Sequence, residues 1–230
     1  MSTPPTRFAV ALFPGFQALD VFGPLDILNL LSKEHALSLT ILAPTTAPVS
    51  TAAPSSGPQA SESVVPTQTY ADALSQLAAD PDAQAVEVLL VPGGIGTRDP
   101  ANVADVEAYV KRAFPHLRYL LTVCTGSALV ARTGVLDGRR ATSNKRAWEW
   151  ATSQGPRVNW VPRARWVTDG GVWTSSGITA GIDMMYAFIA DQFGEDVASR
   201  LADMAEYVRN TDPTNDPFAV DEVKENGVAK

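Results

Sequence analysis

The only cysteine in the chain, Cys124, has the sequence context of a nucleophile. The apolar residues 120–123 precede it, and Thr125-Gly126-Ser127 opens a segment with helical spacing. A cysteine at such a strand-to-helix turn lies beside unpaired backbone N–H groups and the positive end of the helix dipole, which favour thiolate over thiol. We therefore predict that the pKa of Cys124 is depressed and that its sulfur attacks a small electrophile. From spacing alone, a small buried core residue remains the alternative interpretation.

A glycine-rich loop follows another predicted strand. The apolar run 88–91 leads directly into Pro92-Gly93-Gly94-Ile95. Such a loop can turn successive N–H groups toward one point and stabilise an anion, although many glycine-rich loops are simple turns. Its spacing fits neither a dinucleotide nor a phosphate-loop fingerprint. Because ligands of open α/β sheets bind beyond the carboxyl ends of the strands, we expect Gly93, Gly94 and Ile95 to lie near Cys124.

Asp20 is the candidate proton donor. It follows the first predicted strand and has the apolar neighbours Leu19, Val21 and Phe22. Apolar surroundings raise the pKa of a carboxyl group and enable it to donate a proton. The alternative is a carboxylate that merely stabilises the start of a helix through the helix dipole.

No Cys-His pair or metal site is predicted. His35 and His116 are expected at the ends of connections on the opposite side of the sheet from Cys124. One cysteine cannot form an internal disulfide, and two histidines with one cysteine offer too few ligands for a Cys-based metal site. We expect chemistry without a metal or cofactor.

Short apolar runs alternate with amphipathic segments along the chain. This alternation predicts an α/β fold with a mainly parallel central sheet between two helical layers. Asp169-Gly170-Gly171 predicts a hairpin turn, and residues 44–66 are rich in Pro, Ser and Thr and predict irregular structure. Strands are expected at 8–12, 37–43, 86–91, 119–123 and 173–175, and helices at 18–31, 101–114, 126–132, 145–152, 180–193 and 195–209.

Length and charge restrict the possible functions. A chain of 230 residues is compatible with a single domain over 1–230, with a frayed tail near 219–230. The formal net charge of -7 disfavours nucleic acid as a partner. No apolar run approaches the ~20 residues that cross a bilayer, and the first residues lack the apolar core of a signal peptide. We expect a soluble, cytoplasmic protein without membrane partners.

Four sequence blocks, taken in order, resemble the ThiJ/PfpI superfamily. They are residues 13–24, 91–96, 122–127 and 176–183, and the similarity extends from about residue 8 to about residue 218. This superfamily includes the parkinsonism-associated protein and is related to class I glutamine amidotransferases. The resemblance implies a flavodoxin-like, glutamine amidotransferase-like fold and a homodimer. The chain is most similar to the isocyanide (isonitrile) hydratase subgroup, because Thr-Gly follows the cysteine where protease-like members have histidine.

The resemblance implies a reaction and roles for the site residues. Cys124 would attack the terminal carbon of an isocyanide, and water would release an N-formamide, as in a lyase of the hydratase type. Asp20 would contact Cys124 and move protons. The N–H groups of Ile95 and Thr125 would stabilise negative charge, with Gly94 as an alternative donor.

Some features leave the substrate open. After residues 140–142 the hydratases continue with a histidine-containing stretch, whereas this chain has Ser143-Asn144-Lys145. Trp148, Trp166 or Trp173 would line an apolar pocket, unless they belong to the core. The alternatives are glyoxalase-like or deglycase-like action on reactive dicarbonyls, and a non-catalytic redox sensor or chaperone-like protein whose cysteine is oxidised.

Overall fold

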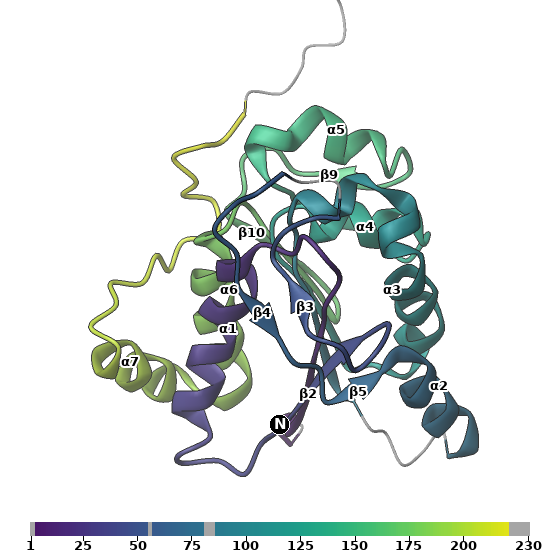
Figure 1. Ribbon diagram of the computed structural model, residues 1–230. Coiled ribbons are helices and arrows are strands. Elements are labelled where there is room, and N and C mark those ends of the chain that lie inside the picture. Colours follow the sequence, from purple (N-terminus) through teal and green to yellow (C-terminus); the bar gives the residue numbers. More distant parts are fainter. Residues whose placement is uncertain (1–2, 55–56, 81–85, 221–230) are drawn as a thin grey trace, which may run out of the picture.

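The computed structural model of the protein describes residues 3–54, 57–80 and 86–220. Its centre is a seven-stranded sheet of order β10-β11-β7-β6-β1-β2-β5 (Figure 1). Neighbouring strands are parallel except in the β10–β11 hairpin, which confirms the predicted fold class. In chain order, the strands of this sheet are β1 (Arg7–Ala11), β2 (Ser38–Ala43), β5 (Gln68–Thr69), β6 (Val88–Val91), β7 (Tyr119–Thr122), β10 (Trp166–Asp169) and β11 (Val172–Ser175).

Helices cover both faces of the sheet (Figure 1). One layer consists of α1 (Ala18–Leu31), α6 (Ala180–Phe193) and α7 (Glu195–Met204). The other consists of α2 (Tyr70–Ala79), α3 (Pro100–Ala113) and α4 (Gly126–Arg132), and α5 (Trp148–Ser153) packs on α4. The short elements are η1 (Ile95–Arg98), η2 (Phe114–His116), η3 (Lys145–Ala147) and the strand pairs β3 (Val49–Ser50) with β4 (Ser63–Val64) and β8 (Arg140–Ala141) with β9 (Asn159–Trp160). Within the described residues, no helix is long and apolar enough to cross a membrane.

The central strands are apolar because both of their faces are covered. Val10, Leu89, Val91, Leu120 and Leu121 are each at most 3% exposed, except that most are fully buried. A strand between two helical layers has no solvent face, so its residues form a continuous apolar run without alternation. The parallel strands place their carboxyl ends, and the loops that follow them, at one edge of a rigid sheet.

The sequence predicts the sheet better than the peripheral helices. The helices at 18–31, 126–132 and 180–193 have the predicted bounds, whereas the predicted helix 195–209 ends at Met204. There Glu206 adopts φ +50°, and the Tyr207 hydroxyl leaves the helical path to donate to the Asp183 carboxylate.

Two other segments also differ from the prediction. α2, which begins at a Thr69 cap that accepts from the N–H of Asp72, was not predicted. The predicted helix 145–152 divides into η3 and α5, and residues 44–66 include the small β3–β4 pair. Of the predicted frayed tail, residues 221–230 lie outside the described part of the chain.

Candidate active site

Four loops meet at the carboxyl edge of the sheet. The loop after β1 leads to Asp20 in the first turn of α1, and the loop after β6 contains Gly93 and Gly94. Cys124 follows β7, and Ser176 follows β11, where its carbonyl accepts from the N–H of Cys124 at 3.0 Å. The topology therefore brings together the predicted site residues of three separate sequence blocks.

Cys124 occupies a sharp turn between β7 and α4. Its φ is +59°, a conformation that residues with a Cβ rarely adopt and that costs on the order of 1–3 kcal/mol. The next residue but one, Gly126, permits the turn, because a Cβ there would lie 2.3 Å from the Val91 carbonyl oxygen. A strained nucleophile elbow of this kind turns the side chain away from the strand and toward the loops at the sheet edge.

The sulfur of Cys124 is surrounded by hydrogen-bond donors. Nδ2 of Asn144 donates to Sγ at 3.0 Å. The backbone N–H groups of Thr125 and Ile178 also donate to it. Ile178 adopts φ +38°, so a second strained residue contributes to the sulfur environment. Three donors around one sulfur stabilise negative charge on it.

Asp20 is a buried acid beside the thiol. Its side chain is fully buried, and Oδ2 accepts from the N–H of Gly93 at 2.9 Å. Oδ1 is buried and has no hydrogen-bond partner of acceptable geometry among the described residues. Burial raises the pKa of Asp20 to about 7, while the Gly93 N–H and the Cys124 thiol oppose the increase. Asp20 therefore exists in both protonation states near neutral pH.

The predicted depression of the Cys124 pKa is wrong. Burial raises the pKa of the thiol to about 12, the charge of Asp20 raises it further, and the donors Asn144, Ile178 and Thr125 oppose the change without cancelling it. The prediction considered only the helix terminus. Desolvation of a thiol that is 6% exposed outweighs the dipole of the seven-residue helix α4. At neutral pH the thiol is protonated and needs a base, and Asp20 is in contact with it.

Thr125 organises the glycine-rich loop. Its Oγ1 accepts from the N–H of Gly94 at 3.0 Å and from Oγ1 of Thr97 at 3.1 Å. Gly93 cannot be replaced without rearrangement, because a Cβ there would lie 2.5 Å from the Thr125 nitrogen. Gly94 adopts φ +136°, and a Cβ there would lie 2.3 Å from the Gly15 carbonyl oxygen. The loop is thus fixed against both the nucleophile turn and the segment that follows β1.

Of the three loop N–H groups predicted to bind substrate, one is available. Gly93 donates to Asp20 and Gly94 donates to Thr125, so both groups have partners within the protein. The N–H of Ile95 begins η1 and has no acceptor in the described part of the chain. Ile95 is also 60% exposed. It is therefore the donor that a substrate can reach.

Asn144 is a site residue that sequence reasoning did not assign. Its Oδ1 accepts from the N–H of Ala147 at 3.0 Å at the start of η3. This bond fixes the amide so that Nδ2 faces the Cys124 sulfur, because the reversed amide would oppose two donors at Ala147. The available signal was the departure of 143–145 from the hydratase pattern, but sequence alone does not place that segment over the sulfur.

A buried ion pair holds the Asn144 segment in place. Nζ of Lys145 lies 3.6 Å from Oδ2 of Asp216 and donates to Oγ1 of Thr142 at 2.7 Å and to the Ala164 carbonyl at 2.8 Å. Burial lowers the pKa of Lys145 to about 8, and the charge of Asp216 opposes that change. The C-terminal segment is thereby attached beside the site.

The block 176–183 supports the site from below. A Cβ on Gly177 would lie 2.8 Å from Nδ2 of Asn144, and one on Gly181 would lie 2.6 Å from Val123. Asp183 is buried and accepts from Nε of Arg165 at 2.6 Å. Small residues at two positions and one buried ion pair therefore allow this block to pack against the nucleophile turn.

Other predicted residues lie away from Cys124. His35 packs edge-on against Phe193, and His116 precedes β7 at the end of the sheet opposite Cys124, in agreement with the prediction. Trp166 and Trp173 are buried in the core. Of the three candidate tryptophans, Trp148 is therefore the one that lines a cavity, which it shares with Lys145.

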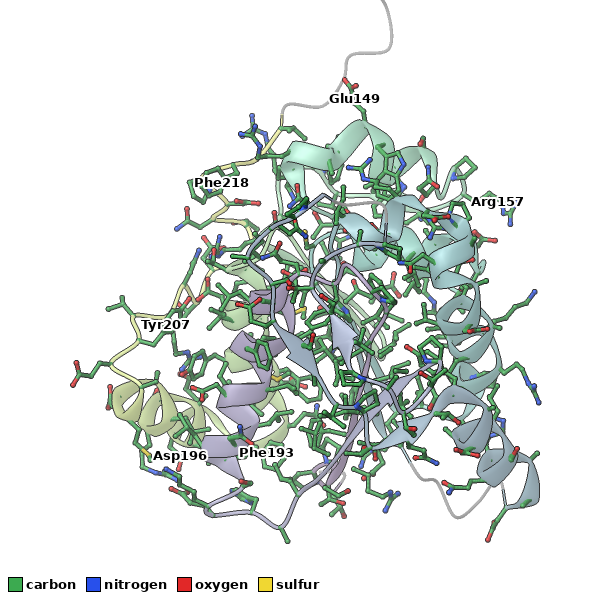
Figure 2. All side chains as sticks on the ribbon, viewed as in Figure 1. Glu149, Arg157, Phe193, Asp196, Tyr207 and Phe218 are labelled. Atoms are coloured by element: carbon green, nitrogen blue, oxygen red, sulfur yellow. The ribbon has the colours of Figure 1, made fainter. Side chains whose placement is uncertain are left out.

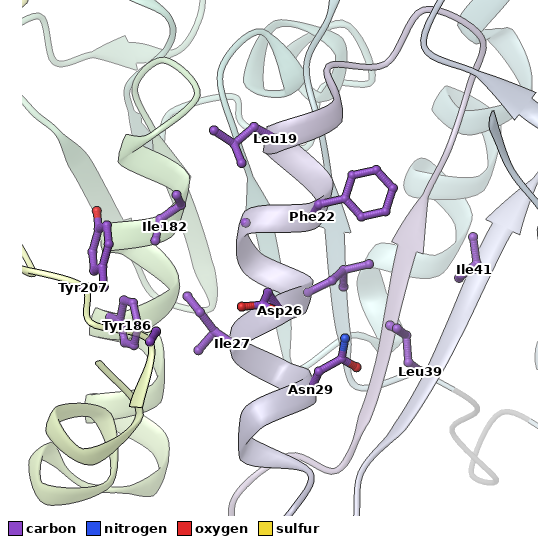
Figure 3. Close-up of a pocket in the computed structure, with 13 residues that line it drawn as sticks. Leu19, Phe22, Asp26, Ile27, Asn29, Leu39, Ile41, Ile182, Tyr186 and Tyr207 are labelled. Carbon is purple, nitrogen blue, oxygen red and sulfur yellow. The ribbon is translucent and has the colours of Figure 1, made fainter. Parts of the chain in front are cut away.

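An apolar groove of about 610 Å³ lies along the outer face of α1 and does not contain Cys124 (Figure 3). Leu19 and Phe22 project from α1, with Ile182 and Tyr207 on one side and Leu39 on the other. Leu19 is 39% and Phe22 43% exposed. The groove begins one residue from Asp20 but lies on the other side of the helix.

Comparisons with known proteins agree with this geometry. The chain is 31% identical to isonitrile hydratase from Pseudomonas putida over 199 residues, which are 85% of this chain and 76% of that protein. It is 40% identical over 85 residues to the HTH-type transcriptional regulator GlxA of Rhizobium meliloti, covering 35% of this chain and 25% of the regulator. A crystal structure of a ThiJ/PfpI family protein from Pseudomonas syringae has a TM-score of 0.69 at 25% identity, covering 94% of this chain and 79% of that one.

The family assignment rests on most of the chain. Residues 6–191 match the family described as DJ-1/PfpI, a range that contains Asp20, Gly93, Cys124 and Asn144. The matched range includes β1 through α6 and therefore every strand of the central sheet. The chain belongs to the DJ-1/PfpI family.

Proposed function

We propose that the protein is a cysteine-dependent enzyme that hydrates an isocyanide to an N-formamide. The observation that supports this most is the contact between Cys124 and Asp20, a buried acid whose pKa is raised to about 7. The similarity to isonitrile hydratase over most of both chains points to the same chemistry. An isocyanide carbon needs a sulfur nucleophile and a proton, and this pair supplies both.

In the first step, the thiol proton of Cys124 passes to the Asp20 carboxylate as sulfur attacks the terminal carbon of the isocyanide. The new C–S bond leaves an electron pair on that carbon. Asp20 returns the proton to the carbon and gives a thioimidate. A carboxyl group with a pKa near 7 suits both transfers, because it neither holds nor releases the proton too strongly. The Asn144 amide stabilises the sulfur while it carries negative charge.

In the second step, water adds to the thioimidate carbon and gives a tetrahedral intermediate. Asp20 accepts a proton from the water, and the nitrogen of the substrate is protonated as the C–S bond breaks. The products are the N-formamide and the regenerated thiol, so the net reaction consumes one isocyanide and one water. The N–H of Ile95 stabilises the oxygen of the intermediate.

The alternative functions have weaker support at this site. A redox sensor needs an exposed thiol of low pKa, whereas Cys124 is 6% exposed and its pKa is raised. Glyoxalase-like or deglycase-like action would place a dicarbonyl on the same sulfur as a hemithioacetal. Neither histidine lies near Cys124 to help move its carbon-bound proton.

We also propose a homodimer that acts in the cytoplasm on a small molecule. α1 is apolar on nearly all sides, and its outer residues Leu19 and Phe22 remain exposed in one chain. A helix with such a composition is typically covered on every side. A reducing compartment would keep the lone thiol of Cys124 in the active form.

Turnover assays test the proposal. Purified protein should convert a simple isocyanide such as cyclohexyl isocyanide to its formamide, while methylglyoxal in a parallel assay should be consumed far more slowly. Cys124→Ala should fold normally and be inactive. Conversion of methylglyoxal without conversion of any isocyanide would support the dicarbonyl alternative and refute the hydratase.

A further inference from the structure

A second cavity lies between η1, η3 and α5. Its volume is about 460 Å³, within the range of small-molecule sites. Figure 2 shows Glu149 of α5 and Phe218 of the C-terminal segment at this end of the molecule. The lining residues are Arg98, Lys145, Arg146, Ala147, Trp148, Glu149, Trp150 and Val220.

The cavity adjoins the nucleophile on two sides. Thr97, which precedes Arg98, donates to Oγ1 of Thr125 at 3.1 Å. Asn144, which precedes Lys145, donates to the Cys124 sulfur at 3.0 Å. The charges of Arg98 and Cys124 also interact. A substrate held by sulfur therefore has this cavity beside it.

The charge of the cavity is opposite to that of the whole protein. Three cationic side chains and one acidic side chain line it, in a chain of formal net charge -7. Lys145 is occupied by Asp216 and by three oxygen acceptors. Among the described residues, Arg98 and Arg146 have no ion-pair partner. Two guanidinium groups are thus free to bind an anion.

Tryptophan side chains provide flat walls. The Arg98 guanidinium stacks on the Trp150 ring, 3.6 Å from its centroid. Stacking holds the guanidinium plane parallel to the indole and leaves the N–H groups at its edge available for a carboxylate. Nζ of Lys145 lies 5.0 Å from the Trp148 ring centroid, so this second indole is also held in place. Indole walls and an arginine edge match a planar molecule with an acidic group.

We propose that this cavity binds the carboxylate-bearing part of the substrate, and that Arg98 determines a preference for anionic, planar substrates. The inference rests on the proposed function for the choice of isocyanide, but the cavity and its charge are independent of it. An aromatic isocyanide with a carboxylate would bind the Arg98 guanidinium while its terminal carbon reaches Cys124.

Charge-selective labelling of Cys124 tests the cavity without any turnover. Iodoacetate and iodoacetamide each form an S–C bond and release iodide, and they differ in a carboxylate against an amide. The rate ratio of the two reagents at Cys124, measured by intact mass and divided by the ratio for free glutathione, should exceed one. In Arg98→Gln this ratio should fall about tenfold, the effect expected for losing one charge-assisted hydrogen bond. Arg112→Gln, an exposed change on α3, should leave it unchanged.

A parallel assay separates this inference from the proposed function. kcat/KM for 4-carboxyphenyl isocyanide should exceed that for phenyl isocyanide in the wild type, and Arg98→Gln should remove the difference. Turnover of both isocyanides with no effect of Arg98→Gln on either assay would overturn the inference and leave the hydratase intact. Selective labelling that depends on Arg98, without turnover of any isocyanide, would support the cavity and overturn the hydratase.

Discussion

Replacing Asn144 by aspartate tests whether its amide stabilises the sulfur. The change keeps the shape of the side chain and the Oδ1 that accepts from the N–H of Ala147. It removes the Nδ2 donor that lies 3.0 Å from Sγ of Cys124 and places a carboxylate there. The variant should therefore fold like the wild type, while negative charge on the sulfur becomes harder to form.

The size of the effect follows from that one hydrogen bond. A hydrogen bond to a charged group contributes about 1.5–3 kcal/mol. Since one pKa unit corresponds to about 1.36 kcal/mol, loss of the donor should raise the pKa of Cys124 by about one to two units. At a fixed pH below the pKa, alkylation should slow about 10-fold to 100-fold, and the second carboxylate near Asp20 should increase the effect.

The assay is the rate of Cys124 alkylation by neutral iodoacetamide between pH 6 and 10, followed by intact mass. The rate profile of Asn144→Asp should move to higher pH. Asn144→Ala is the matched variant, because it also loses the donor but adds no charge. It loses the cap of η3 as well, at a cost of about 1 kcal/mol in stability.

The two variants together make the reasoning refutable. Slow alkylation in both, with a lower Tm in Asn144→Ala alone, is the predicted pattern. An alkylation rate and pH profile that match the wild type in a folded Asn144→Asp protein would show that the amide does not stabilise the thiolate.

Three further predictions concern the acid, the ion pair and the assembly. Asp20→Asn should lower kcat/KM by about 10²–10⁴-fold, and it should raise Tm at pH 8 but not below pH 4. The stability contributed by Asp20 is present below its unfolded pKa of 3.8 and is lost as pH rises through about 7, a loss that asparagine avoids. Asp216→Asn should destabilise the protein by about 3 kcal/mol at pH 6; denaturant unfolding should show less at pH 9, where Lys145, with a pKa of about 8, is neutral. Sedimentation should show a dimer, which Phe22→Glu on the groove of Figure 3 should dissociate, whereas a wild-type monomer would refute the assembly.

The sequence predicted the fold where one physical rule dominated. Strands such as β6 and β7 are buried on both faces, so their residues are apolar without interruption and are recognised directly. The predicted helix that in fact ends at Met204 was misjudged, because Tyr207 and Val208 continue the apolar spacing while the Asp183 contact of Tyr207 lies outside the helix. Tertiary contacts of this kind leave no local pattern.

The site was predictable in its parts but not in its electrostatics. Cys124, Asp20 and the Gly93 loop follow strands that end at one edge of the sheet, which topology alone brings together. Asn144 reaches the sulfur through a segment that follows β8, outside the main sheet, and no pattern in the sequence indicates its position. The pKa of Cys124 depends on burial and on the Asp20 charge, which only the packed structure reveals.

The adduct on Cys124 is the most direct test of the mechanism. The protein should be mixed with an aryl isocyanide, quenched with acid at times between milliseconds and seconds, and measured as intact and digested protein by mass spectrometry. The mechanism predicts a transient increase equal to the whole mass of the isocyanide, located on Cys124, that decays as the N-formamide appears. In Asp20→Asn the adduct should form and decay more slowly. Formamide production by the wild type without any adduct on Cys124, or undiminished production by Cys124→Ala, would contradict the account.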